Sequence, residues 1–107
     1  MDNITIDNFL LNDTTLNKNL NNCLWCAIFM IQFAYIKNVD DYDSLFEHGM
    51  VFTSVKDIEE FESWFEVNKD YIISKLNKTF DSNITDITPK DFIALLVKYA
   101  REDRLLL

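Results

Sequence analysis

The chain has 107 residues, of which 49% are hydrophobic, and carries a formal net charge of −8. This size and apolar content predict a single domain over residues 1–107 with ample material for a core, and they argue against intrinsic disorder. One glycine and one proline leave little material for the turns of a large sheet, so the composition favours helices with short connections.

The N-terminal third predicts a short first element and then a long apolar helix. Residues 1–12 form a short helix or an extended segment, and Asp13, Thr14 or Thr15 is expected to cap the second helix. From Leu16 to Lys37, apolar residues recur at helical spacing on one side, and the opposite side is apolar as well. A helix that is hydrophobic all round is normally enclosed by others, so this segment is expected to be the central helix.

The same region predicts neither a membrane span nor a secretion signal. Its longest apolar run, residues 23–36, is shorter than the ~20 residues that a membrane span needs. Residues 1–11 lack the basic and long apolar regions of a secretion signal. We therefore expect a cytoplasmic protein that does not enter a membrane.

The middle of the chain predicts two further helices. A short one begins at Asp41 or Asp43 and ends at His48, and a short strand is allowed near residues 50–53. A third major helix is expected from Val55 to Lys78, with the polar run at residues 68–70 as a candidate interruption.

The last helix has the clearest start signal of the chain. Thr88 is a favourable N-cap, Pro89 suits the first helical position, and Asp91 places an acid in the first turn. The helix is expected to run to about Arg104. The fold class is thus mainly all-α, a compact bundle of four to five helices around a central apolar helix.

The whole net charge lies in one stretch of the sequence. Between Asp40 and Asp70 there are ten acids and two bases, and the charges of the remaining residues sum to zero. Such a field attracts a positively charged partner and repels nucleic acid and anionic membranes. The candidate partner-binding residues are these ten acids and one neighbouring aromatic residue: Asp40, Asp41, Asp43, Glu47, Asp57, Glu59, Glu60, Glu62, Glu66, Asp70 and Trp64.

Four of these acids form a narrow stripe on the predicted third helix: Glu59, Glu62, Glu66 and Asp70. Two interpretations of the stripe stay open. Charge on a solvent face keeps a small protein in solution, and that alone accounts for many such helices. Like charges at these spacings repel one another, however, which favours a face kept for a partner.

No motif in the sequence predicts catalysis, a cofactor or a metal. Cys23 and Cys26 match C-x-x-C but fall within the apolar run, where core packing is the expected role. His48 is expected to lie at a helix end, and the acidic run at residues 40–43 lacks the pattern of a calcium loop. The four bases of the last helix are too few for a nucleic-acid site. We therefore expect a protein that is not an enzyme.

Two classes of function are consistent with these features. The first is an acidic protein-binding inhibitor, either a bacterial immunity protein or antitoxin that neutralises a basic, nuclease-like toxin domain, or a phage anti-defence protein (anti-CRISPR or anti-restriction) that mimics nucleic acid. The likeness to immunity proteins is one of size, charge and absent catalytic motifs. The second is a structural or assembly module that pairs with itself or a larger complex through residues 105–107 and the apolar second helix. We choose the immunity or antitoxin function over the others.

Overall fold

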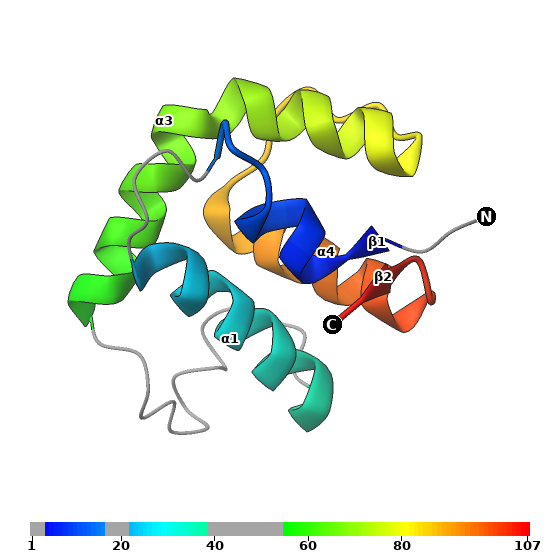
Figure 1. The fold of residues 1–107 in the computed structure, drawn as a ribbon, viewed down its shortest axis with the longest axis horizontal. Helices are drawn as coiled ribbons and strands as arrows, with labels where there is room; N and C mark the ends of the chain where they lie inside the picture. The colour runs from blue at the N-terminus through cyan, green and yellow to red at the C-terminus, as the bar shows by residue number, and fades with distance from the viewer. Residues whose placement is uncertain (1–3, 17–21, 39–54) are drawn as a thin grey trace.

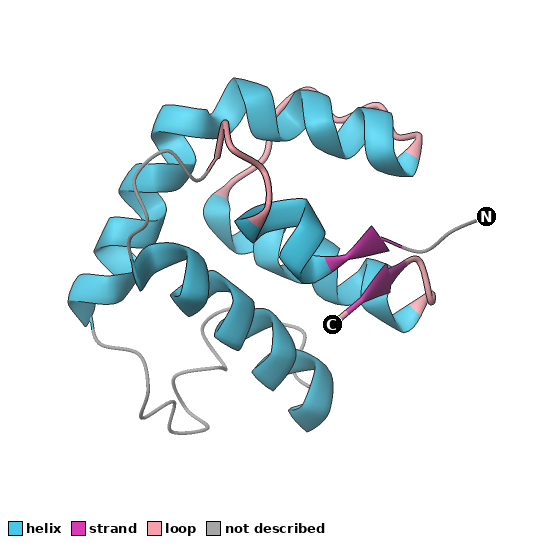
Figure 2. Ribbon diagram, in the orientation of Figure 1, coloured by secondary structure: helices cyan, strands magenta, loops and turns pink. Residues whose placement is uncertain are grey.

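The computed structural model describes residues 4–16, 22–38 and 55–107, and these are mainly helical (Figures 1 and 2). This confirms the predicted fold class. The elements, in chain order, are strand β1 (Ile4–Thr5), the short π-helix η1 (Asp7–Leu11), helices α1 (Asn22–Lys37), α3 (Val55–Phe80) and α4 (Pro89–Arg101), and strand β2 (Leu105–Leu106). The short helix expected over residues 41–48 and the strand expected near 50–53 lie outside the described residues.

Helix α1 packs against both α3 and α4, and one of its sides lies in the core. Ala27 and Ile31 on that side are fully buried. On the opposite side, Trp25, Phe29 and Ile36 are 43%, 41% and 75% exposed. The prediction that α1 is enclosed all round is therefore correct for one side and wrong for the other, because a large part of each of these three side chains faces solvent.

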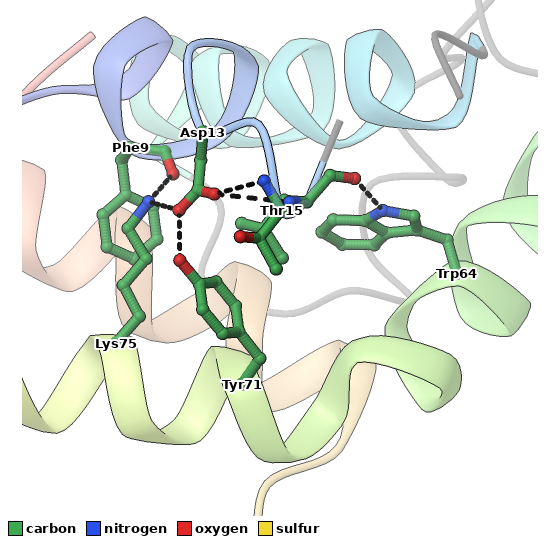
Figure 3. A network of polar contacts seen from close by, with 7 residues as sticks. Phe9, Asp13, Thr15, Trp64, Tyr71 and Lys75 are labelled. Atoms are coloured by element: carbon green, nitrogen blue, oxygen red, sulfur yellow. Dashed lines mark hydrogen bonds and ion pairs between the residues drawn. The ribbon is translucent and has the colours of Figure 1, made fainter. Parts of the chain in front are cut away.

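Helix α3 is continuous but bends midway (Figure 1). Figure 3 shows Trp64 on one arm of the helix and Tyr71 on the other. Between them, the side-chain amide of Asn68 donates a hydrogen bond to the backbone carbonyl of Trp64 at 2.9 Å, one turn earlier. A polar side chain that occupies this carbonyl competes with the helical hydrogen bond and bends the helix. Asn68 thus favours the bend in α3, and the polar run at residues 68–70 does not interrupt the helix.

Helix α4 begins as the sequence predicts. The Thr88 hydroxyl accepts a hydrogen bond from the backbone N–H of Asp91 at 3.1 Å, and Pro89 is the first helical residue. The helix ends at Arg101, three residues before the predicted end. It stops there because Asp103 adopts a left-handed conformation with φ of 60°, which reverses the chain direction.

All three long helices are followed by an Asn or Asp in this left-handed conformation: Asn38, Asp81 and Asp103. Glycine is the usual residue at such helix ends, and Asn and Asp are the next best because their short side chains tolerate positive φ. A chain with a single glycine therefore ends its helices with the two residues that it has in abundance.

The two ends of the described chain meet in a parallel pair of strands, with Ile4 beside Leu105 and Thr5 beside Leu106. The residue before β2, Arg104, donates to the carbonyl of Phe80, at the C-terminal end of α3, at 2.5 Å. Its guanidinium also lies over the rings of Phe80 and Tyr99, with 4.7 Å to the Tyr99 centroid. This cation joins the ends of α3 and α4 and complements the negative end of the α3 dipole.

Candidate functional site

The predicted acidic face is present on the surface of α3. Five of the predicted site acids are solvent-exposed on this helix: Glu59, Glu60, Glu62, Glu66 and Asp70. Asp57 is half-buried in the first turn, where a carboxylate stabilises the positive end of the helix dipole. The other four predicted site acids lie outside the described residues: Asp40, Asp41, Asp43 and Glu47.

Four of these exposed acids form a compact stripe, which we call the acidic face and define as Glu59, Glu62, Glu66 and Asp70. At 100° per residue, these four positions fall within about 80° of the helix circumference. Within the described residues, Glu59 and Glu62 accept no hydrogen bond and form no ion pair. Each i, i+3 or i, i+4 pair of like charges on a helix costs about 0.2–0.5 kcal/mol. The face therefore carries repulsion that contacts with the described residues of the chain leave largely unrelieved.

A base beside this face, Lys69, is already paired with an acid outside it. Lys69 Nζ lies 2.6 Å from the Asp86 carboxylate, which belongs to the connection between α3 and α4. This hydrogen bond lowers the pKa of Asp86 and is the main cause that raises the pKa of Lys69, with Glu66 and Asp70 adding to the effect. The pair is exposed, so its contribution to stability is small.

The aromatic residue predicted to belong to the site is not on the surface. Trp64 is 9% exposed, stacks against Phe61 in the core, and donates from its indole N–H to the Leu16 carbonyl at 3.1 Å. This placement removes Trp64 from the candidate contact residues. Sequence reasoning missed the apolar residue that does flank the acidic face: Val67 is 84% exposed and lies about 60° around the helix from Asp70.

A second polar cluster joins the N-terminal segment to the second arm of α3 (Figure 3). The Asp13 carboxylate accepts from Lys75 Nζ at 2.6 Å, from the Tyr71 hydroxyl at 2.7 Å and from the backbone N–H of Thr15 at 2.9 Å. Lys75 also donates to the Phe9 carbonyl and lies over the Phe9 ring, 4.6 Å from its centroid. We call this group the Asp13 network.

The Asp13 network is held together by charge. Partial burial would raise the pKa of Asp13, but hydrogen bonds from Lys75, Tyr71 and Thr15 outweigh it and hold that pKa below the usual value. The bond to Asp13 is the main reason that the pKa of Tyr71 is raised. Because each of these groups already has a partner in the chain, the network fits a structural role, namely to fasten residues 9–16 to α3.

Further features of the described residues concern the metal, thiol and membrane predictions from the sequence. No group of three or more His, Cys, Asp or Glu side chains there is placed to hold a metal ion. Cys26 is 5% exposed in the core, as predicted for it from the apolar run. No helix among the described residues is long and apolar enough to cross a membrane.

Comparison with protein families, curated proteins and solved structures finds no match to this chain.

Proposed function

We propose that this protein is an acidic inhibitor of the immunity or antitoxin class, which binds a basic, nuclease-like toxin domain through the acidic face of α3. It acts by occlusion and not by catalysis. The observation that carries the proposal is the exposed, closely spaced row of carboxylates from Glu59 to Asp70 on a single helix.

The energetics of this row support a binding role over a purely solvating one. Mixed acids and lysines would hydrate the surface equally well and would attract one another at i, i+4. Glu62, Glu66 and Asp70 instead place like charges at that spacing, and the neighbouring base, Lys69, is bonded to Asp86 outside the face. A partner that brings Lys or Arg to the face relieves this repulsion. The free energy of the repulsion in the unbound protein therefore adds to the affinity for such a partner.

The mechanism rests on electrostatics. A cluster of carboxylates steers a basic domain toward the face and speeds association, most strongly at low salt. On contact, carboxylate oxygens accept hydrogen bonds from the Lys and Arg side chains that otherwise hold phosphate groups. Val67, exposed at the edge of the face, supplies an apolar contact next to the ion pairs.

A capture experiment with matched variants tests the proposal. Tagged wild-type protein is used to isolate partners from its host lysate at low and high salt, and the captured protein is then purified and titrated calorimetrically. The double variant Glu62→Gln/Glu66→Gln removes two charges from the face. Asp7→Asn/Asp91→Asn removes two charges from exposed acids elsewhere and serves as the control.

We expect a basic partner that elutes with salt, binds the face variant at least about tenfold more weakly, which is 1.4 kcal/mol, and binds the control like wild type. Co-expression should also suppress the partner's toxicity. Equal affinity of both variants for the partner, or a partner that survives high salt, contradicts the proposal. Capture of a restriction or CRISPR enzyme would assign the same face to phage anti-defence.

A further inference from the structure

Helix α1 carries a second exposed surface of opposite character to the acidic face. Trp25, Phe29 and Ile36 are 43%, 41% and 75% exposed, and the rings of Trp25 and Phe29 contact each other with centroids 6.0 Å apart. With half-buried Gln32 they fall on one line along the helix, at spacings of four, three and four residues. We call these four residues the α1 stripe. Large apolar side chains exposed along one side of a helix are typical of an interaction site.

The spacing of the four positions in the stripe is symmetric about its centre, which lies between Met30 and Ile31. A two-fold axis through that point, perpendicular to the helix, places Trp25 of one copy opposite Ile36 of the other and Phe29 opposite Gln32. An isologous dimer requires this kind of self-complementary surface. The antiparallel arrangement therefore pairs a large ring with an aliphatic side chain at each end of the interface.

The absence of acids on α1 also favours a second copy of the chain as the partner that binds the α1 stripe. Residues 22–37 contain no acid, and the one base, Lys37, lies at the end of the helix. The α1 stripe thus offers nothing to the basic partner that the acidic face would attract. For a chain with a net charge of −8, it is a surface on which two copies approach without placing carboxylates against each other.

We propose that two copies of this chain associate through antiparallel packing of their α1 stripes. One helix pair buries less than the ~1,200 Å² of a standard interface, so the dimer forms at micromolar concentrations or above. The acidic face lies on α3 and not on α1, so dimerisation and the binding of a basic partner are separate events.

Sedimentation velocity from about 5 to 500 μM, concentrations that span a weak association, tests this proposal. We expect a dimer fraction that rises with protein concentration and with salt, since salt screens the mutual repulsion. Ile36→Glu should weaken dimerisation by at least about tenfold, because it buries an unpaired charge in the interface. Val67→Glu is the matched control, since it places the same charge on an exposed apolar residue of α3 and should dimerise like wild type.

A cross-link tests the antiparallel register independently. Within one helix, residues 25 and 36 are about 16 Å apart, too far for a disulfide, whereas the proposed pairing brings them together between copies. Trp25→Cys/Ile36→Cys in a Cys23→Ser background should therefore form a covalent dimer on mild oxidation. A wild-type protein that stays monomeric to 500 μM, or equal effects of Ile36→Glu and Val67→Glu, would overturn the proposal.

Discussion

Lys75 of α3 and Asp13 of the N-terminal segment form an ion pair of 2.6 Å, although 62 residues separate them in sequence. Both side chains are largely buried, with 17% and 11% of their surface exposed. The pair is therefore shielded from solvent and salt far better than Lys69–Asp86, in which the carboxylate is 78% exposed. Together with the hydrogen bond from Trp64 to the Leu16 carbonyl, this contact holds residues 9–16 against α3.

Removing the Lys75 charge should loosen the N-terminal segment. Lys75→Met keeps a long unbranched side chain but removes the ammonium group that lies over the Phe9 ring and pairs with the Asp13 carboxylate, and we expect a loss of about 2 kcal/mol in the free energy of unfolding. Urea denaturation measures the loss, and hydrogen exchange should show reduced protection around Phe9. Lys78→Met, at an exposed position on the same helix, is the control. Equal stability of the two variants would contradict the role of the Asp13 network.

The same network predicts a pH dependence. The folded-state pKa of Asp13 lies below its usual value of 3.8, so the unfolded chain binds a proton first as the pH falls. The stability due to Asp13 is present above about pH 4 and is lost as the pH falls through the folded-state pKa. Denaturation between pH 2 and 6 should show a smaller acid loss in Asp13→Asn than in wild type. Asp86→Asn is the control, because Asp86 is the other described carboxyl whose pKa is lowered. Its ion pair with Lys69 is exposed, so added salt should screen the contribution of that pair to stability.

Reversing one charge on the acidic face should stabilise the free protein. Glu66→Lys converts the repulsions with Glu62 and Asp70 into attractions at i, i+4, but it turns the attraction between residue 66 and Lys69 into a repulsion, so we expect a net gain of about 0.2–0.5 kcal/mol in thermal or urea denaturation. If the face binds a basic partner, the same variant loses affinity. A variant that is more stable but binds the partner more weakly would indicate that the face serves binding and not only hydration. A variant that is less stable than wild type would contradict the repulsion inferred from the helix geometry.

The two tryptophans should differ sharply in solution at low protein concentration. Trp64 is 9% exposed and Trp25 is 43% exposed. The Trp25→Phe variant keeps only the buried Trp64, so its fluorescence emission should be blue-shifted and weakly quenched by acrylamide. Trp64→Phe should leave red-shifted, readily quenched emission and cost about 1–2 kcal/mol, since the Leu16 carbonyl loses its donor. Equal quenching of the two variants would place Trp64 at the surface after all.

Glycine at a left-handed helix end should stabilise the fold. Asp81 comes directly after α3 with φ of 53°, a conformation that a Cβ disfavours by about 1 kcal/mol. We expect Asp81→Gly to raise the melting temperature and Asp81→Ala to lower it, because alanine lacks the polar side chain that tolerates this conformation. Calorimetry of the two variants gives the comparison, and a lower melting temperature for Asp81→Gly would show that the left-handed residue does not limit stability.

The sequence alone determined the features that depend on local order. The Thr88–Pro89 start of α4 and the stripe from Glu59 to Asp70 result from capping chemistry and helical periodicity, and the structure has both. Periodicity also identified the extent of α3 to within two residues at its C-terminal end. What the stripe binds stays a prediction, because charge gives the sign of a partner and not its identity.

Only the tertiary structure decided which faces meet. Both sides of α1 are apolar, so periodicity could not tell that Ala27 lies in the core while Trp25 faces solvent. The Asp13–Lys75 pair and the strands that join Ile4 to Leu105 link residues far apart in sequence, and no local pattern marks such partners. Burial and long-range pairing depend on how whole elements pack together, since each contact must offset the entropy of closing the intervening chain.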